Sequence, residues 1–386
     1  MNVCFETFGC RLNRAEALED EAKAIAAGNT VVKEHSKADV IIIRGCSVTG
    51  KAQHECEHFI EHLKKHYPNK RIWKTGCLKD SKPFVIKSEG IVVPMRTARA
   101  YLKVQDGCNS SCTFCTVPKF RGKSVSVPFD EVVKKAQAFV AAGYHEIVVT
   151  GCNLVQYHDS EANAQLTDLV SALCAINPEV RVRLGSIEPG VIAYKLVDLM
   201  KATPNLCKFL HLSIQSGSDK VLMDMRRPYK TKELAELLGY AQKEMPLLSI
   251  GCDLIAGFPT EEEMDYRLTQ SLFSRFNITR AHVFPYSERP GTVAAARLLQ
   301  VPKEVRRHRA HRIAALSDEN GRLFKKKFVG REVEVVIETS DEHTPAGWTS
   351  EYIWCEFPNL KGRKGLRRTI VRGHVYEVTG DGFRAR

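Results

Sequence analysis

The sequence lacks a long apolar segment and a targeting leader. No apolar run approaches the roughly 20 residues that a membrane-spanning helix needs, and the start, Met1 to Gly9, has no basic stretch followed by an apolar one. We therefore expect a cytoplasmic protein without a membrane span, in a compartment that keeps thiols reduced. Cysteine is nevertheless plentiful, with 13 residues. An odd number of cysteines in such a compartment argues against disulfides and favours metal or redox chemistry.

The composition excludes wholesale disorder and a disulfide-rich scaffold. Hydrophobic residues make up 44% and charged residues 26% of the chain, as in ordinary globular proteins. A length of 386 residues indicates two or three domains. The formal net charge of +12 makes a polyanionic partner plausible without identifying one.

The first ninety residues predict a small parallel sheet in which each strand ends in Gly-Cys. The expected order is strand, helix, strand, helix, strand, at Val3–Phe8, Asn13–Ala27, Asp39–Ile43, Thr49–His66 and Arg71–Thr75. The three strands are followed by Gly9-Cys10, Gly45-Cys46 and Gly76-Cys77. Because the carboxyl ends of parallel strands meet at one edge, these thiols can converge on one point. Three thiolates would leave an iron–sulfur cluster with one open iron. Three unrelated buried cysteines are the alternative.

A second group of cysteines is closer in sequence. Cys108, Cys112 and Cys115 have the spacing CxxxCxxC, and a loop this short can place three thiolates around one cluster. A zinc site usually shows a second CxxC pair nearby, and none follows here. Chance clustering in a loop is the remaining alternative.

The central part of the chain alternates between strands and helices. The expected strands are Tyr101–Gln105, Glu146–Thr150, Arg181–Gly185, Phe209–Ile214, Ile250–Ala256 and Arg280–Pro285. The expected helices are Pro128–Ala142, Gln165–Ile176, Val191–Ala202, Thr231–Glu244 and Glu261–Phe276. Six such units are fewer than a complete eightfold barrel, so we expect an open, partial (βα)6 barrel of TIM type. Its ligands should lie at the carboxyl ends of the strands, where polar and glycine residues gather.

These segments together resemble the radical S-adenosylmethionine methylthiotransferases. The matching segments cover essentially the whole chain and are Thr7 to Asn13, Gly45 to Thr49, Thr75 to Cys77, Cys108 to Pro118 with Arg121-Gly122, His211 to Asp219, and Phe284 to Thr292. The combination is specific, although no single segment would be.

The resemblance implies two [4Fe–4S] clusters and S-adenosylmethionine as cofactors. Cys108, Cys112 and Cys115 would bind the cluster that cleaves S-adenosylmethionine, and Cys10, Cys46 and Cys77 the cluster that carries the inserted sulfur. Phe114 matches the aromatic position beside the adenine. Ser186, Glu188 and Gln215 lie where such enzymes often contact the rest of the cofactor. No residue is assigned a catalytic role of its own.

Within this family the chain looks like the MtaB group. The signals are Gly-Cys-Arg-Leu-Asn13, Cys46-Ser-Val-Thr49 and His282-Val-Phe-Pro-Tyr-Ser. That group adds a methylthio group to C2 of N6-threonylcarbamoyladenosine at tRNA position 37. The alternatives are isopentenyladenosine at that position, a ribosomal protein aspartate, or a non-catalytic iron–sulfur protein that binds RNA or senses redox state.

The C-terminal part is basic and strand-rich. Between Arg297 and Arg331 there are eleven Lys or Arg against three acids, with a helical pattern up to about Lys327. Strands expected at Arg331–Glu338, Tyr352–Phe357 and Thr369–Val378 suggest a small β-barrel, which resembles the tRNA-binding TRAM domain. Its phosphate path would be lined by Lys361, Arg363, Lys364, Arg367, Arg368 and Arg372.

The expected organisation and partners follow from these parts. The fold class is α/β, with an N-terminal sheet domain over residues 1–95, a radical core over 96–320 and a TRAM-like domain over 321–386. The expected partners are the anticodon loop of tRNA, an electron donor and a sulfur donor, with both donors unidentified. The remaining cysteines are expected to be core thiols, and the histidines to pack or face solvent.

Overall fold

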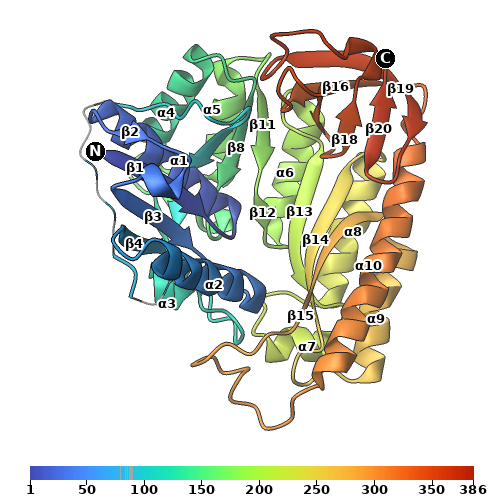
Figure 1. Cartoon of the computed structure of the whole chain (residues 1–386). Helices are drawn as coiled ribbons and strands as arrows, with labels where there is room; N and C mark the ends of the chain where they lie inside the picture. Colours follow the sequence, from blue (N-terminus) through green and yellow to red (C-terminus); the bar gives the residue numbers. More distant parts are fainter. Residues whose placement is uncertain (79, 83, 85, 87–89) are drawn as a thin grey trace.

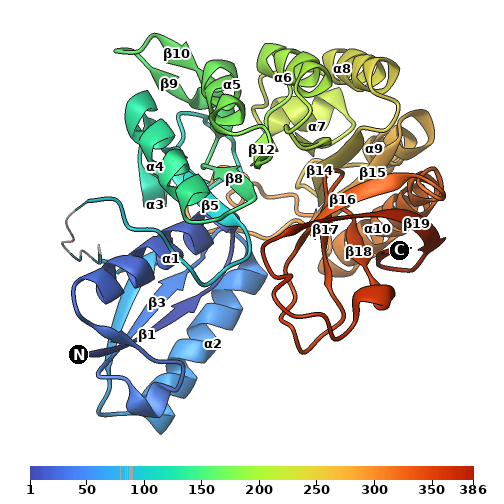
Figure 2. The ribbon, with the colours of Figure 1, turned by 90° about the horizontal axis from the view of Figure 1, so that it is seen from above.

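A computed structural model describes residues 1–78, 80–82, 84, 86 and 90–386 of the chain. The described residues form an N-terminal sheet, a central open barrel and a small closed barrel at the C-terminus (Figures 1 and 2). The closed barrel lies beside the starts of the central strands, and the N-terminal sheet lies along the side of the central barrel.

The N-terminal sheet is parallel and has helices on both faces. Its elements are β1 (Asn2–Thr7), α1 (Arg11–Ala26), β2 (Thr30–Val31), β3 (Val40–Gly45), α2 (Gly50–His66) and β4 (Arg71–Gly76). The strand order is β2-β1-β3-β4. Strand β3 lies inside this sheet and is buried along its whole length, as its run of β-branched residues predicts. The three strands that precede Gly-Cys steps are therefore neighbours in space.

The central barrel is an open set of parallel strands. Its strands are β5 (Ala100–Lys103), β8 (Glu146–Thr150), β11 (Arg181–Leu184), β12 (Ser186–Ile187), β13 (Phe209–Gln215), β14 (Ser249–Ala256) and β15 (Ile278–Pro285). They hydrogen-bond in the orders β11-β8-β5 and β12-β13-β14-β15. Only Gly185 separates β11 from β12, so this one stretch of chain connects both groups.

Helices cover the outside of these strands and complete the largest apolar core. They are α4 (Phe129–Ala141), α5 (Leu166–Ile176), α6 (Val191–Ala202), α8 (Thr231–Glu244), α9 (Glu263–Arg275) and α10 (Lys303–Lys326). The short helices α3 (Val117–Arg121) and α7 (Asp219–Asp224) lie near the carboxyl ends of the strands. Two small antiparallel pairs, β6 (Gln105–Asp106) with β7 (Val125–Ser126) and β9 (His158–Asp159) with β10 (Ala164–Gln165), lie in the connections.

The C-terminal part is a closed five-stranded barrel. Its strands are β16 (Glu332–Ile337), β17 (Ala346–Thr349), β18 (Trp354–Glu356), β19 (Ile370–Val378) and β20 (Gly382–Ala385), in the order β16-β17-β18-β20-β19. Gly347 and Gly382 permit this closure, because a Cβ at either position would lie 1.9 Å from a carbonyl oxygen of the neighbouring strand. Only glycine allows two backbones to approach so closely.

The structure confirms the predicted fold class and changes some boundaries. The helical pattern expected from Arg297 begins at Lys303, because Pro302 is the N-cap residue and prolines favour helix starts over helix interiors. Strands β17 and β20 were not expected from the sequence. Among the described residues, no helix combines the length and apolar character that crossing a membrane requires.

Candidate active site

Cys10, Cys46 and Cys77, here called the N-terminal cysteine trio, follow three neighbouring parallel strands, β1, β3 and β4. Cys46 and Cys77 are buried, whereas Cys10 is exposed. Gly9 has a φ of 96°, and a Cβ there would lie 2.4 Å from the Cβ of Cys46. Glycine before Cys10 therefore lets the backbone of one ligand candidate pass directly over another.

Burial and the charges of the other members raise the pKa values of the two buried thiols in the N-terminal cysteine trio. Burial raises the pKa of Cys46, and the charge of Cys10 raises it further. Burial also raises the pKa of Cys77; Arg121 opposes this, while Cys46 and Cys10 add to it. Three thiols that repel one another when ionised need a cationic centre between them to become thiolates together.

Cys108, Cys112 and Cys115, the loop cysteine trio, lie between β6 and α3. Two of the sulfurs accept backbone hydrogen bonds, Cys108 from the amide of Ser110 and Cys115 from the amide of Val117, both at 3.4 Å. Such N–H donors stabilise the ionised form of the sulfur. Burial still raises the pKa of Cys115 to about 11, so a bound cation would have to favour its thiolate.

Arg227 supports the third sulfur of the loop cysteine trio. Its Nη1 donates to the Sγ of Cys112 at 3.1 Å, and its Nη2 pairs with the carboxylate of Glu188 at 2.7 Å. Burial raises the pKa of Cys112, and Arg227 opposes that effect. The sequence analysis gave Arg227 no role, because its contact with Cys112 spans 115 residues.

Neither cysteine trio forms a compact site for a single zinc ion. Thiolates around a tetrahedral zinc lie about 3.8 Å apart, given Zn–S bonds of about 2.3 Å. Across the described residues, the sets of three or more potential ligand atoms within 4.8 Å of one another are Cys4–Glu6–His35 and His211–Asp253–His282. Neither cysteine trio is this compact. Each trio offers three thiols, the number of ligands that a [4Fe–4S] cluster with one open iron would take from the protein.

Arg121, at the end of α3, connects the two trios. Its Nε donates to the Sγ of Cys77 at 3.0 Å, and its Nη2 donates to the Oδ1 of Asn13 at 2.6 Å. Its Nη1 lies 3.0 Å from carboxylate oxygens of Glu16 and Asp106. Asn13 lies three residues after Cys10, and Asp106 lies two residues before Cys108. One buried guanidinium therefore fixes the position of the N-terminal sheet relative to the loop that carries Cys108, Cys112 and Cys115.

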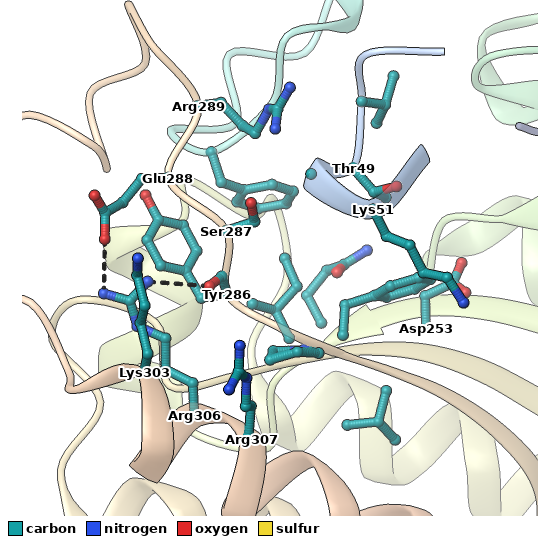
Figure 3. Close-up of a pocket in the computed structure, with 18 residues that line it drawn as sticks. Thr49, Lys51, Asp253, Tyr286, Ser287, Glu288, Arg289, Lys303, Arg306 and Arg307 are labelled. Carbon is teal, nitrogen blue, oxygen red and sulfur yellow. Dashed lines mark hydrogen bonds and ion pairs between the residues drawn. The ribbon is translucent and has the colours of Figure 1, made fainter. Parts of the chain in front are cut away.

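A cavity of about 850 Å³ lies beside these groups, where the N-terminal sheet meets the rim of the central barrel (Figure 3). Thr49 and Lys51 reach it from the start of α2, Asp253 from β14, and Arg306 and Arg307 from α10. Its wall also contains apolar side chains, including Phe114, Ile255, Val283 and Phe284. The cavity can thus hold a flat apolar group and an anionic group together.

The side chains predicted to contact S-adenosylmethionine divide into two pairs. Phe114 and Gln215 both line the cavity, and Gln215 has a φ of 67°, which is uncommon for a residue other than glycine. Ser186 and Glu188 are not among the residues that line it. Ser186 is exposed at the start of β12, and the carboxylate of Glu188 is held by Arg227.

Comparison with known proteins identifies the family. Residues 2–96 match the Uncharacterized protein family UPF0004, and residues 102–272 match the Radical SAM superfamily. The chain is 30% identical to the threonylcarbamoyladenosine tRNA methylthiotransferase MtaB of Bacillus subtilis, over 97% of this chain and 94% of that protein. The chain belongs to the radical SAM tRNA methylthiotransferases. Enzymes of this family use S-adenosylmethionine and two [4Fe–4S] clusters.

Two further proteins are similar to this chain. One has a different name within the family, and the other shares only the fold. The tRNA-2-methylthio-N(6)-dimethylallyladenosine synthase of Chlorobium limicola is 27% identical over 97% of this chain and 92% of that protein. The radical S-adenosylmethionine methyltransferase TsrM of Kitasatospora setae, solved with cobalamin and a [4Fe–4S] cluster, has a TM-score of 0.53 and 11% identity over 76% of this chain and 77% of that chain.

The methylthiotransferase also contains a histidine–aspartate group that the sequence analysis missed. The Oδ1 of Asp253 lies 3.1 Å from the Nε2 of His211 and 3.2 Å from the Nδ1 of His282. Burial would raise the pKa of Asp253, but both histidines outweigh it and lower the pKa. Asp253 therefore faces the cavity as an ionised carboxylate. The signal was a set of polar residues on three adjacent strands: His282 of β15 lies opposite Asp253 of β14, and His211 of β13 lies opposite Gly251, two residues before Asp253.

The basic side chains of the C-terminal barrel are not equally free to bind RNA. Arg367 donates to the carbonyl oxygen of Arg96, and Arg368 donates to those of Met95 and Thr97. Arg372 pairs with Glu334 at 2.5 Å. The other three predicted phosphate contacts, Lys361, Arg363 and Lys364, are exposed. Arg367 and Arg368 thus contact the segment before β5, whereas Lys361, Arg363 and Lys364 make no such contact among the described residues.

Proposed function

We propose that this chain transfers a methylthio group to C2 of N6-threonylcarbamoyladenosine at position 37 of tRNA. The observation that carries this choice of substrate is the cationic wall of the cavity. The threonylcarbamoyl group has a carboxylate, whereas a dimethylallyl group is apolar. Among the described residues, Lys303 and Arg307 have no ion-pair partner, and both line the cavity. Two unneutralised cations favour the anionic substituent.

We also propose that the loop cysteine trio holds the cluster that binds S-adenosylmethionine, and that the N-terminal cysteine trio holds the second. When bound, these groups supply the one-electron chemistry and the sulfur that replacement of an aromatic C–H bond requires, since acid–base groups alone do not activate such a bond. Arg227 and Arg121 hold Cys112 and Cys77 by charge-assisted hydrogen bonds. Phe114 and Gln215 remain the proposed cofactor contacts in the cavity, while Glu188 is paired with Arg227 and Ser186 is exposed at the start of β12.

The domain boundaries proposed here are 1–95, 96–320 and 321–386. The apolar cores support this division. The first contains residues up to Ile86, the buried residues of the second run from Ala100 to Ile313, and the third begins at Phe324. Two residues cross these boundaries: Val93 packs against the second core and Leu247 against the third. Helix α10 contributes to the second and third cores. We propose that the third domain binds the anticodon arm of tRNA through Lys361, Arg363 and Lys364, and that the enzyme acts in the cytoplasm with separate electron and sulfur donors.

Analysis of tRNA nucleosides tests the reaction and the substrate together. A strain that lacks the gene should lose 2-methylthio-N6-threonylcarbamoyladenosine, accumulate its unmodified precursor, and regain the product when the gene is restored. If the strain instead lost the methylthiolated isopentenyladenosine, that nucleoside would be the substrate in place of threonylcarbamoyladenosine. If it lost a modified ribosomal aspartate, the substrate would be a protein and not a tRNA. An unchanged nucleoside profile would contradict the proposed function.

The cavity wall has its own test with a matched control. Arg307→Glu should raise the KM for the threonylcarbamoyladenosine-containing tRNA about tenfold, because a repulsive charge replaces an attractive one beside the substituent. Arg312→Glu makes the same charge change on the exposed side of α10, outside the cavity lining, and should leave KM within about twofold. Equal effects of the two variants would indicate general RNA attraction and contradict recognition in the cavity.

A further inference from the structure

Helix α2 carries a row of histidines that the proposed reaction does not use. His54, His58, His62 and His66 follow one another at intervals of four residues, and all four are exposed. The opposite face of the helix packs into the N-terminal domain through Cys56, Ile60 and Leu63. Residues four apart are neighbours on a helix surface, so the imidazoles form one row along the solvent side of α2.

The rings of this row associate in two pairs. The ring centroids of His54 and His58 are 4.7 Å apart, and those of His62 and His66 are 4.0 Å apart and stacked. At these separations, the two imidazoles of a pair can reach one ion with small rotations about their side-chain bonds. The two ends of the row are too far apart to share an ion, since the twelve residues from His54 to His66 rise about 18 Å.

The hydrogen bond of His66 fixes which of its nitrogens is available. Its Nδ1 lies 2.9 Å from the carbonyl oxygen of His62. Because a carbonyl oxygen only accepts, Nδ1 carries the proton, and the Nε2 of the neutral ring keeps its lone pair. A backbone carbonyl that holds the second ring nitrogen in this way is the arrangement usual for metal-binding histidines.

We propose that α2 carries two bis-histidine sites for divalent transition-metal ions, one formed by His54 and His58 and the other by His62 and His66. Ions that prefer imidazole, such as Ni²⁺, Cu²⁺ and Zn²⁺, fit these sites, whereas Mg²⁺ and Ca²⁺ prefer oxygen ligands. The sites are separate from both cysteine trios and do not depend on the proposed function. A bound ion links successive turns of α2 and stabilises the folded helix.

Calorimetric titration of the untagged, cluster-containing full-length protein with Ni²⁺ tests the proposal. The parent protein should bind about two more Ni²⁺ per chain than the variant with all four histidines changed to alanine. The double variants His54→Ala/His58→Ala and His62→Ala/His66→Ala should each lose one ion. Alanine favours helix, so the helical circular dichroism signal should be preserved, and comparison between variants cancels any Ni²⁺ bound at cysteines.

A matched control compares the α2 pairs with two exposed helical histidines whose neighbours are cations. His308→Ala/His311→Ala removes two exposed histidines of α10 that are three residues apart and lie among arginines. This variant should bind as many Ni²⁺ ions as the parent protein. If it lost as many ions as the α2 double variants, or if the fourfold variant bound as many as the parent, the proposal would be wrong. Production of 5′-deoxyadenosine should be equal in all these variants.

Discussion

The two ends of the central barrel are built from the same strands but differ in how their charged groups are paired. At the carboxyl ends, thiols, a cavity and the partly exposed cations Lys303 and Arg307 are present. At the other end, Glu146 is fully buried and paired with Arg99, Arg181 and Arg183. These strand-start arginines also donate to the C-terminal barrel, for example Arg183 to the carbonyl oxygen of Thr349 at 2.7 Å. One end pairs the charge of Glu146 within the protein, and the other retains thiols and cations that can contact ligands.

The contrast extends to the aromatic side chains. Tyr352 of the C-terminal barrel stacks on Trp348, and its ring lies 5.0 Å from the guanidinium carbons of Arg183 and Arg11. Burial would raise the pKa of Tyr352, but Arg11 and Arg99 outweigh it and lower the pKa. Arg11 follows Cys10, so this closed end also contacts the N-terminal domain. The strand-start end, with its paired charges, thus contacts all three domains. The carboxyl end, with the cysteine trios and the cavity, contains the candidate active site.

The largest expected effect is at the loop cysteine trio. Cys112→Ala should reduce cleavage of S-adenosylmethionine by at least about 100-fold, because a cluster ligand is lost while the core is unchanged. The measurement is 5′-deoxyadenosine released by the reduced, reconstituted enzyme. Cys174→Ala, which removes a buried core thiol of α5, should retain activity. Full activity of the Cys112 variant would contradict its assignment as a ligand.

The N-terminal cysteine trio should behave differently. Cys46→Ala should keep 5′-deoxyadenosine release within about twofold while the methylthiolated nucleoside falls by at least about 100-fold, because only the sulfur-carrying cluster is affected. Both products can be quantified in one reaction by mass spectrometry. Full formation of the methylthio product would exclude the proposed role of this trio.

At the closed end, stability should change more than chemistry. Glu146→Gln should lower the free energy of unfolding by about 3–5 kcal/mol, because it leaves the buried Arg181 and Arg183 without their counter-charge and Arg99 with Glu338 alone. Urea unfolding measures this, with Glu244→Gln as the control. Glu244 pairs with Lys201 at the surface, where solvent screens the charges, and its loss should cost far less. Equal losses would mean that the closed end is not held by its charges.

The same carboxylate predicts a pH dependence. Burial opposes ionisation of Glu146, but Arg183, Arg181 and Arg99 outweigh it and lower its pKa below the ordinary value of 4.5. Its contribution to stability should therefore be complete above about pH 4.5 and decrease as the pH falls below that value. In Glu146→Gln this part of the acid dependence should be absent.

The smallest expected effect concerns the basic loop of the C-terminal barrel. Lys361→Ala/Arg363→Ala/Lys364→Ala should weaken tRNA binding about tenfold and reduce the slope of log K against log salt by about 2. Lys134→Ala/Lys195→Ala/Lys232→Ala removes the same charge from α4, α6 and α8 and should change affinity less than threefold. An equal slope for both variants would indicate attraction by net charge alone.

The sequence predicted the regular elements of the central barrel closely. Strand β8 and helices α6 and α8 have the predicted bounds, because each has a strong apolar pattern and clear ends. Strands β17 and β20 were missed because Gly347 and Gly382 make them look like turns. Their glycines are required by close contact with a neighbouring strand, and that contact is visible only once the barrel is closed.

The candidate site was predicted in part for a similar reason. The cysteines stand out through spacing and through repeated Gly-Cys steps, which are local features. Arg121 and Arg227 act on sulfurs 44 and 115 residues away, so their partners depend on the tertiary fold. Likewise, an acid at the start of a buried strand, Glu146, is explained only by arginines from two adjacent strands. The four-residue histidine spacing was visible, but its significance depended on exposure and ring geometry.

Helix α10 has a consequence for how a long substrate would be held. It is one uninterrupted helix of 24 residues, about 36 Å long at 1.5 Å per residue. Arg306 and Arg307 near its start line the cavity, and Phe324 near its end belongs to the core of the C-terminal barrel. The helix thus acts as a fixed spacer between the cavity and the C-terminal barrel that we propose binds tRNA, and it sets the distance between the bound arm and the nucleotide to be modified.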